Sequence, residues 1–354
     1  MTKKLGKIAI MTGGGDCPGL NAAIRAVVKT AHFEMGSRAI GLLDGFEGLM
    51  YGKFRDLGLN DVANILNSGG TILGSSNKAS LYHPEDVSDV ALENLKKWNI
   101  DALFCVGGDG TLSIAGKFLD KFPRIIGIPK TIDNDLKCTD LTIGFDTACS
   151  FVTEALDRLH YTAESHHRVM VVEVMGRYAG WLALNGGLAG GGDIILIPEM
   201  PFSFDKVVKA VEKRRHAGKR SSIVVVSEGA RPKGEDYTVS SVVKDSPDPI
   251  RLGGIAKRVS DVIEESLGCE SRVTVLGHLQ RGGAPSFLDR MLATNLGAHA
   301  VHLAARGEFG RLVVYKNGVI RDDELKASVS GLKLVEEGSD LVKRARSVGV
   351  EFGV

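Results

Sequence analysis

Seven short apolar runs, most of them rich in Val and Ile, recur along the chain and constrain its fold more than any other feature. A glycine or polar turn follows each run, and a helical pattern follows the turn. The apolar character of the runs is continuous rather than alternating, which is typical of strands buried on both faces of a parallel sheet. The predicted strands are residues 7–11, 102–106, 124–128, 169–174, 194–197, 222–227 and 273–276.

The segments between these strands show helical periodicity. Leu20, Ile24 and Val27 are spaced to line one face of a helix, and residues 92–98 repeat the pattern. Alternation of strands and helices predicts a doubly wound α/β fold. Residues 230–252 are rich in charge, Ser and Pro, which predicts a surface excursion with a short hairpin. The tail, residues 328–354, is predicted to be helical in part.

Size and charge narrow the possible functions. A chain of 354 residues is too long for one small core, so we expect two domains. A formal net charge of +1 gives no broad field for nucleic acid or a membrane surface, and neither is an expected partner. No apolar stretch approaches the ~20 residues that span a bilayer. The five cysteines show neither zinc-site nor disulfide spacing, so we expect a soluble cytoplasmic protein with reduced thiols.

Two glycine loops follow predicted strands. Gly13, Gly14 and Gly15 precede a helix that starts near Leu20, and successive glycines let backbone N–H groups approach an anion. A plain strand–helix turn is an equally good interpretation of that loop alone. The second loop, GGDGT at residues 107–111, contains Asp109, which is a natural Mg²⁺ ligand beside a phosphate or, alternatively, a helix cap.

A third segment, IPKTIDND at residues 128–135, places two carboxylates two residues apart after a strand. Open α/β sheets bind ligands at the carboxyl ends of their strands. Either Asp133 or Asp135 can take a proton from a substrate hydroxyl while the other helps to hold a metal. An Asx-turn would explain one aspartate, but neither Lys130 nor the pairing with the GGDGT loop.

Six motifs in order resemble the phosphofructokinase family over about residues 7–306. They are TGGGDCPGLNAAIR, GGDGT, PKTIDND, VEVMGRYAGW, SEG and VTVLGHLQRGG. GGDGT alone is also similar to NAD kinases and lipid kinases, and the other motifs argue against both. The resemblance implies two Rossmann-like αβα domains, with residues 1–144 and 280–330 binding ATP and Mg²⁺. Residues 145–279 and 331–354 would bind the sugar phosphate.

The resemblance also implies an activity: transfer of the γ-phosphoryl group of ATP to the 1-hydroxyl of fructose 6-phosphate, a step of glycolysis. Asp133 would be the base, flanked by Thr131 and Asp135, and Arg177 would neutralise charge in the transition state. Asp109 would hold Mg²⁺ on the nucleotide. The residues expected at ATP are Gly14, Lys78, Gly108, Asp109, Gly110, Thr111 and Lys130, and the backbone of Gly14 would also meet the transferred phosphoryl group.

The sugar side follows from the same resemblance. Glu228 would bind a sugar hydroxyl beside Met175, Gly176 and Arg177. The 6-phosphate would be clamped by Arg168, Arg272, His278 and Arg281. Residues matching Arg168 and Arg272 reach in from a neighbouring subunit in this family, so a homotetramer with shared active sites is expected.

The phosphoryl donor depends on two positions. Pyrophosphate users of the family typically carry Asp where this chain has Gly110, and Lys where it has Lys130, whereas typical bacterial ATP users have Gly at both. A side chain at 110 would occupy the space of the α-phosphate, so Gly110 favours ATP, and Asn77 stands where ATP users carry an Arg, with Lys78 as the expected substitute. A pyrophosphate-dependent enzyme and a catalytically silent phosphate-binding subunit remain the alternatives.

Overall fold

The computed structural model describes residues 5–242 and 250–354 and divides the chain into two compact units. Unit 1 comprises residues 1–147 and 281–332, and unit 2 comprises residues 148–280 and 333–354. The chain therefore passes from one unit to the other three times along its length. No described helix combines the length and apolar character needed to cross a membrane.

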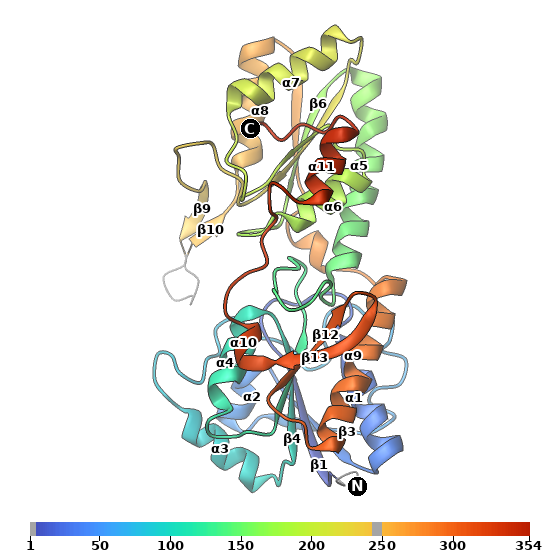
Figure 1. Cartoon of the computed structure of the whole chain (residues 1–354), viewed down its shortest axis with the longest axis vertical. Helices are drawn as coiled ribbons and strands as arrows, with labels where there is room; N and C mark the ends of the chain where they lie inside the picture. Colours follow the sequence, from blue (N-terminus) through green and yellow to red (C-terminus); the bar gives the residue numbers. More distant parts are fainter. Residues whose placement is uncertain (1–4, 243–249) are drawn as a thin grey trace. The chain divides into compact units, whose positions relative to one another are not determined.

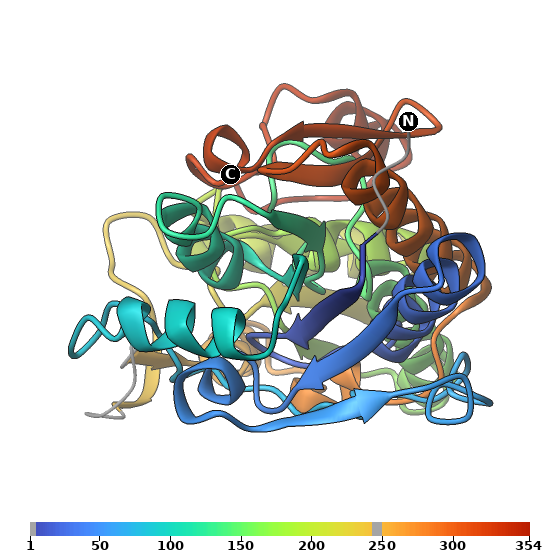
Figure 2. The same ribbon diagram turned by 90° about the horizontal axis from the view of Figure 1, so that it is seen from below.

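Unit 1 is built on a seven-stranded sheet in the order β13-β12-β5-β4-β1-β2-β3. The five inner strands pair in parallel, and β3 and β13 add antiparallel edges. Figure 2 shows β1, β2 and β3 in successive shades of blue. The strands are β1 (Lys7–Thr12), β2 (Arg38–Leu42), β3 (Phe54–Leu57), β4 (Ala102–Gly107), β5 (Ile125–Pro129), β12 (Arg311–Lys316) and β13 (Val319–Glu324).

Helices cover both faces of this sheet. On one face α1 (Leu20–Met35) packs along α9 (Phe287–Arg306) (Figure 1). A continuous core on the other face joins the strands to the remaining helices through side chains such as Leu95, Leu112 and Leu325. Those helices are α2 (Phe46–Tyr51), α3 (Ser88–Lys97), α4 (Asp109–Phe118) and α10 (Leu325–Ser328). Because both faces are covered, the inner strands are apolar without alternation.

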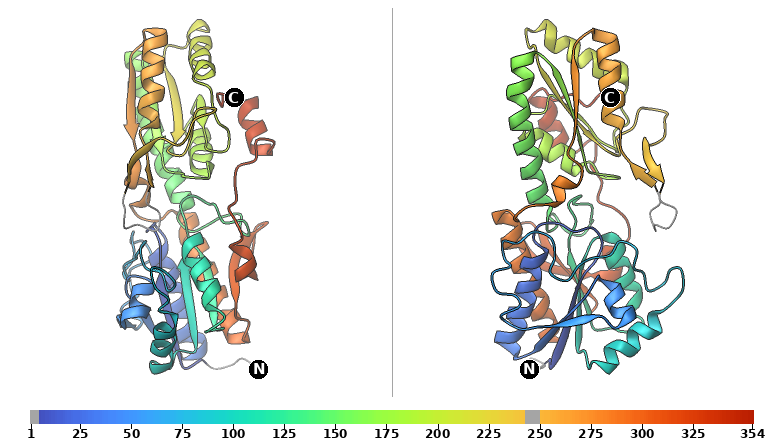
Figure 3. Two further views of the ribbon diagram at one scale, coloured as in Figure 1. Left: turned by 90° about the vertical axis from the view of Figure 1, so that its left-hand side faces the viewer. Right: turned by 180° about the vertical axis from the view of Figure 1, so that it is seen from behind.

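Unit 2 has a smaller, fully parallel sheet of four strands in the order β11-β6-β8-β7. Helices cover both faces of this sheet (Figure 3). Gly186 of α6 allows close approach to α5, since a Cβ there would lie 2.7 Å from Val152. The strands are β6 (Val169–Val174), β7 (Ile194–Leu196), β8 (Ser222–Ser227) and β11 (Ser271–Val275). The helices are α5 (Phe145–His166), which begins in unit 1, α6 (Trp181–Ala189), α7 (Phe204–His216), α8 (Ile255–Leu267) and α11 (Asp340–Ser347).

The predicted α/β class and all seven predicted strands are confirmed, with ends that differ by at most two residues. The predicted hairpin forms from β9 (Val239–Val242) and β10 (Ile250–Leu252), which pair antiparallel. Residues 243–249, between them, lie outside the described residues. The tail is helical in part, as predicted, through α11. The predicted strands of unit 1 pair in parallel, and β3 and β13, which were not predicted, add antiparallel edges.

Candidate active site

Three loops of unit 1 follow β1, β4 and β5, which are neighbours in the sheet. Their carboxyl ends therefore lie at one edge, and backbone hydrogen bonds join the loops directly. Gly13 N–H donates to the Val106 carbonyl over 2.9 Å, and Lys130 N–H donates to the Gly107 carbonyl over 2.9 Å. The two glycine loops and the IPKTIDND segment thus form one continuous surface, at the edge where such sheets bind ligands.

Backbone conformation and close neighbours favour glycine in the first loop. Gly14 has a φ of 78°, in the left-handed region. A Cβ at Gly13 would lie 2.7 Å from Thr111 Oγ1, and one at Gly15 would lie 1.7 Å from Arg281 Nη1. Ser75 Oγ donates to the Gly14 carbonyl over 2.5 Å and holds the loop from the other side. The loop is therefore a backbone-lined surface that a phosphate can approach closely.

Lys130 is buried beneath this loop. Its Nζ donates to the Gly15 carbonyl over 2.5 Å, so the side chain links the third segment to the first loop. Burial lowers the pKa of the Lys130 ammonium. A buried cation beside the first loop makes this surface more favourable for an anion.

Asp133 is half-buried at the start of the turn, and its backbone N–H donates to Thr131 Oγ1 over 3.1 Å. Within the described part of the chain its buried Oδ1 has no hydrogen-bond partner. Burial raises the pKa of Asp133, while the charges of Arg281 and Lys130 act in the opposite direction. A carboxylate with one oxygen left open is suited to accept a proton from a ligand.

The turn itself is held by Asn134, whose φ is 50°. Its Nδ2 donates to the Asp140 carbonyl over 3.0 Å, and Thr142 Oγ1 donates to the Thr131 carbonyl over 2.6 Å. These contacts fix the turn that carries Asp133 and Asp135. Asp135 is half-buried one residue beyond Asn134.

Asp109 is the first residue of α4 and is half-buried, and burial raises the pKa of its carboxyl. Among the described residues no group of three or more His, Cys, Asp or Glu could hold a metal ion. A lone carboxylate beside glycine loops nevertheless fits Mg²⁺, which is typically held by one or two carboxylates together with substrate phosphates and waters. Gly110, the next residue, is exposed, and a Cβ there would meet nothing within 4 Å.

Residues 75–78 pack against the first loop, and Lys78 is exposed at the end of this segment. The backbone N–H of Lys78 donates to Ser76 Oγ over 3.2 Å. Asn77 comes nearer to the loop, with its Oδ1 3.9 Å from the Cβ position of Gly14. Thr111 is buried, and its Oγ1 is 3.5 Å from that same position. Gly108 is the residue before α4.

Unit 2 gathers a second set of predicted residues after β6 and β8, which are parallel neighbours. Gly176 has a φ of 127°, and its carbonyl accepts a hydrogen bond of 2.5 Å from Ser227 Oγ. Glu228 N–H donates to the Val174 carbonyl over 2.8 Å, so Arg177 and Glu228 leave neighbouring strand ends. The Arg177 guanidinium lies 5.0 Å from the ring centroid of Tyr178.

The segment after β11 joins this set. Gln280 Oε1 accepts a hydrogen bond of 3.3 Å from Met175 N–H, and β11 is the other parallel neighbour of β6. His278 is exposed on the short 3₁₀ helix Gly277–Arg281 that ends at Arg281. In unit 2, Met175, Arg177, Glu228 and His278 thus all follow the carboxyl ends of strands.

Arg168 and Arg272 do not belong to that set. Arg168 immediately precedes β6, and Arg272 pairs with Met170 near the amino end of β11. Arg168 Nε donates to Glu270 Oε2 over 2.6 Å, and Arg272 donates to the other oxygen of Glu270. The six residues of β6, about 20 Å of strand, separate Arg168 from the strand end that carries Arg177. This pair of arginines therefore lies toward the opposite ends of the strands from Arg177 and Glu228.

Sequence reasoning did not single out several residues that shape these surfaces. Asp289 of α9 is buried and accepts hydrogen bonds from Gly144 N–H and Thr147 N–H, each over 2.8 Å. Its partners lie far away in the sequence, so no short motif contains this contact. The spacing of Ser286 and Asp289 is a helix-start signal that could have marked the position. Glu270 and Gln280 gave no comparable signal.

Among the described residues, glycine loops, a buried lysine and the unpartnered Oδ1 of Asp133 follow the ends of parallel strands, an arrangement typical of α/β proteins that bind phosphate groups. The family model described as "Phosphofructokinase" matches residues 7–304. "ATP-dependent 6-phosphofructokinase 2" of Clostridium perfringens is 50% identical, over 99% of this chain and 100% of that protein. "Pyrophosphate--fructose 6-phosphate 1-phosphotransferase" of Amycolatopsis mediterranei is 48% identical, over 98% of this chain and 100% of that protein.

Solved structures agree. A phosphofructokinase from Saccharomyces cerevisiae superposes with a TM-score of 0.82 at 34% identity and covers 92% of this chain, which spans 45% of the yeast chain. A pyrophosphate-dependent phosphofructokinase from Nitrosospira multiformis, with a TM-score of 0.82 at 23% identity, shares the fold. The chain belongs to the phosphofructokinase family, as the motifs indicated.

Proposed function

We propose that this chain is an ATP-dependent 6-phosphofructokinase, which converts fructose 6-phosphate and ATP to fructose 1,6-bisphosphate and ADP in glycolysis. The observation that carries the proposal is the half-buried Asp133, whose open Oδ1 stands in a site shared with Lys130 and Arg281. The relatives named ATP-dependent 6-phosphofructokinase, at 47–50% identity, support it.

Asp133 is the base in this mechanism. Its Oδ1 accepts the proton of the sugar 1-hydroxyl as that oxygen attacks the γ-phosphorus, and the bond from phosphorus to the ADP oxygen breaks. Thr131 and Asp135 flank the base on the same turn. Phosphoryl transfer depends on positioning and charge neutralisation more than on covalent help, so the fixed turn around Asn134 is part of the catalytic arrangement.

The nucleotide is assigned to the domain of residues 1–144 and 280–330. The backbone of Gly14 meets the transferred phosphoryl group, and Lys130 neutralises phosphate charge from below the loop. Asp109 would hold Mg²⁺, which supplies charge neutralisation on the phosphates. Lys78, Gly108, Gly110 and Thr111 complete the proposed nucleotide site.

The sugar phosphate is assigned to the domain of residues 145–279 and 331–354. Glu228 binds a sugar hydroxyl beside Met175 and Gly176, and Arg177 neutralises charge in the transition state. His278 and Arg281 contact the 6-phosphate from one chain, and Arg168 and Arg272 contact it from another. Those two arginines lie at the opposite ends of the strands, which supports the proposal that a second subunit contributes them to the site.

A homotetramer in the cytoplasm follows from this proposal, with no nucleic acid or membrane as a partner. In the shared site, Glu270 holds Arg168 and Arg272 as a pair, so both guanidinium groups are oriented before they reach a neighbour's phosphate. The family resemblance supplies the expectation of four subunits.

ATP as the donor rests on Gly110, because overall identity does not decide it. Relatives named for ATP and for pyrophosphate match at 50% and 48%. Gly110 is exposed with open space around its Cβ position, so the space beside Asp109 is free for the α-phosphate of a nucleotide. A pyrophosphate-dependent enzyme is the second candidate, because Lys130 is shared with that branch.

The proposal is tested by substituting the base. Asp133→Ser should lower kcat for fructose 1,6-bisphosphate formation by roughly 10²–10⁴-fold, the usual contribution of a positioned base, with a smaller change in KM. Asp120→Ser is the matched control, because Asp120 lies on the surface of the same unit in an ion pair with Lys326. Near-normal kcat in purified Asp133→Ser would remove Asp133 from this role.

A further inference from the structure

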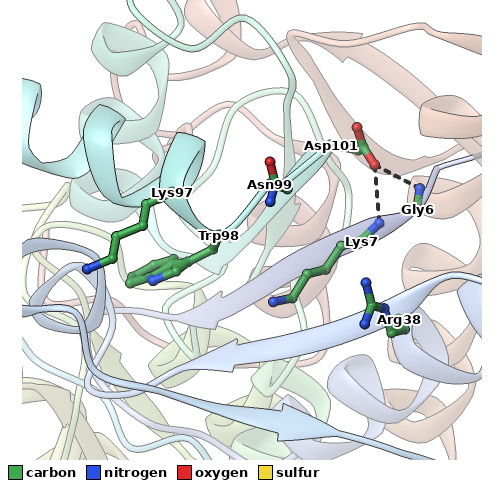
Figure 4. A pocket seen from close by; sticks show the side chains of 7 residues that line it. All are labelled: Gly6, Lys7, Arg38, Lys97, Trp98, Asn99 and Asp101. Carbon is green, nitrogen blue, oxygen red and sulfur yellow. Dashed lines mark hydrogen bonds between the residues drawn. The ribbon is translucent and has the colours of Figure 1, made fainter.

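A hollow of about 400 Å³ opens at the amino ends of the strands of unit 1 (Figure 4). Its lining comes from the start of β1, the start of β2 and the end of α3. The glycine loops follow the carboxyl ends of β1 and β4, so the hollow lies at the opposite edge of the sheet. None of the candidate active-site residues lines it.

Three cationic side chains line this hollow: Lys7, Arg38 and Lys97. Over residues 5–242 and 250–354, none of the three side chains has an ion pair or a hydrogen bond to another residue, and Arg38 and Lys97 are exposed. They come from three different elements, and Figure 4 shows Lys7 Nζ and Arg38 on one side of the Trp98 ring, with Lys97 Nζ directed away from both. Cations brought together around a hollow raise the local positive potential and favour an anionic ligand.

One carboxylate, that of Asp101, lies in the lining, and the backbone already engages it. Asp101 Oδ2 accepts hydrogen bonds from Gly6 N–H over 2.7 Å and Lys7 N–H over 3.1 Å. Arg124 Nη1 lies 3.4 Å from its other oxygen. Asp101 therefore fixes the floor of the hollow, and its charge is compensated from behind by Arg124.

An aromatic wall completes the hollow. Trp98 is half-buried, and its ring lies 4.7 Å from that of Phe54 at an interplanar angle of 56°. Lys7 Nζ lies 5.7 Å from the Phe54 ring centroid, so a cation and two rings are held in one group. An indole wall supported from behind offers a flat surface on which a planar ring can stack.

We propose that this hollow binds a nucleoside phosphate, with the phosphate between Lys7 and Arg38 and the base against Trp98. A cavity of about 400 Å³ is within the ~300–1,000 Å³ range of small-molecule sites. Binding here is separate from the active site, and the proposal does not depend on the activity proposed above.

The test uses the intrinsic fluorescence of Trp98. The chain has two tryptophans, so Trp181→Phe leaves Trp98 as the sole one in the full-length protein. Titration with AMP should change its emission saturably. Lys7→Glu and Arg38→Glu, made in this background, should each raise Kd at least about tenfold, which corresponds to ~1.4 kcal/mol. Lys96→Glu is the matched control, since Lys96 is exposed on α3 outside the hollow and the substitution makes the same charge change.

Two results would overturn the proposal. One is emission that does not change saturably up to about 10 mM AMP, a concentration about ten times a Kd of 1 mM. The other is an equal Kd in Lys96→Glu and Lys7→Glu, which would place the nucleotide elsewhere, including the active site. A parallel titration with inorganic phosphate tests the contribution of the base. Phosphate should have a higher Kd than AMP, and an equal Kd would contradict stacking of the base on Trp98.

Discussion

Asp133 is half-buried, and its two cationic neighbours act against the effect of burial on its pKa. Burial disfavours the charged carboxylate and raises the pKa, whereas the charges of Arg281 and Lys130 favour the ionised form. In the proposed mechanism, this balance sets the pH at which Asp133 can accept a proton. A substitution at Lys130 or Arg281 should therefore change the pH dependence of the reaction.

Removing the charge of Lys130 should move the pH profile. A base must be ionised to act, so kcat/KM falls as pH drops through the pKa of Asp133. Lys130→Met removes one of the influences that lower this pKa, so the acidic limb of kcat/KM should shift to higher pH. Profiles of log(kcat/KM) against pH, measured with saturating MgATP, give the limb directly.

Lys130→Arg is the control for that profile, because it keeps a positive charge at the same position. Its acidic limb should remain closer to that of the unsubstituted protein than the limb of Lys130→Met. A limb that moves to lower pH in Lys130→Met would show that another group, and not Asp133, controls the acidic side.

At the scale of elements, Asp289 ties α9 to the start of α5. Both of its oxygens accept buried hydrogen bonds, from Gly144 N–H and from the backbone and hydroxyl of Thr147. Burial nevertheless raises the pKa of Asp289 to about 6. Gly144 follows directly on Ile143, which pairs with Lys130, so this contact supports the segment that carries Asp133, the proposed base.

Asp289→Ala should destabilise the protein by about 3 kcal/mol, because it leaves buried N–H groups without acceptors. Urea unfolding at one fixed protein concentration measures the change. Asp89→Ala, which removes an exposed partner of Lys121, is the control and should stay within about 1 kcal/mol of the unsubstituted chain. Equal midpoints for the two variants would exclude the supporting role of Asp289.

The apolar runs predicted seven strands, most of them buried. They missed β3 and β13, which lie at the sheet edges and carry exposed charged residues such as Arg55 and Asp323. β2 and β12 were missed as well, although four residues of β2 and three of β12 are buried. An edge strand is protected by polar side chains rather than marked by apolar ones, so its sequence resembles a turn.

The candidate site could be predicted wherever its residues belong to one short segment. Gly14, Asp109 and Asp133 lie in loops that follow predicted strands, and the structure brings those loops together. Gln280, Glu270 and Asp289 act on residues about a hundred or more positions away, and no local pattern records such a contact. The pairing of Arg168 with Arg272 through Glu270 is visible only once β6 and β11 are neighbours.

At the scale of the whole molecule, shared active sites should allow one defective chain to rescue another. Asp133→Ser removes the base, and Arg272→Ala removes a phosphate contact that we assign to a neighbouring subunit. Each variant alone should be weakly active. Hybrids obtained by joint refolding or coexpression should regain activity, because some interfaces then combine an intact Asp133 with an intact Arg272.

Rescue is measured as kcat at saturating fructose 6-phosphate. The reference is a mixture of the two variants that were purified separately and combined without unfolding. A hybrid no more active than that mixture would place Arg272 in its own chain's site or outside the site. The chain mass of 37.8 kDa sets the scale for confirming that hybrids are oligomers.

The measurement that tests the central claim most directly compares two phosphoryl donors. Purified protein with Mg²⁺ and fructose 6-phosphate is assayed for fructose 1,6-bisphosphate with ATP and, in parallel, with pyrophosphate. We predict turnover with ATP and loss of at least about tenfold in kcat/KM for ATP in Gly110→Asp, with Gly110→Ala as the control. Turnover of the unsubstituted protein with pyrophosphate and not with ATP would contradict the account.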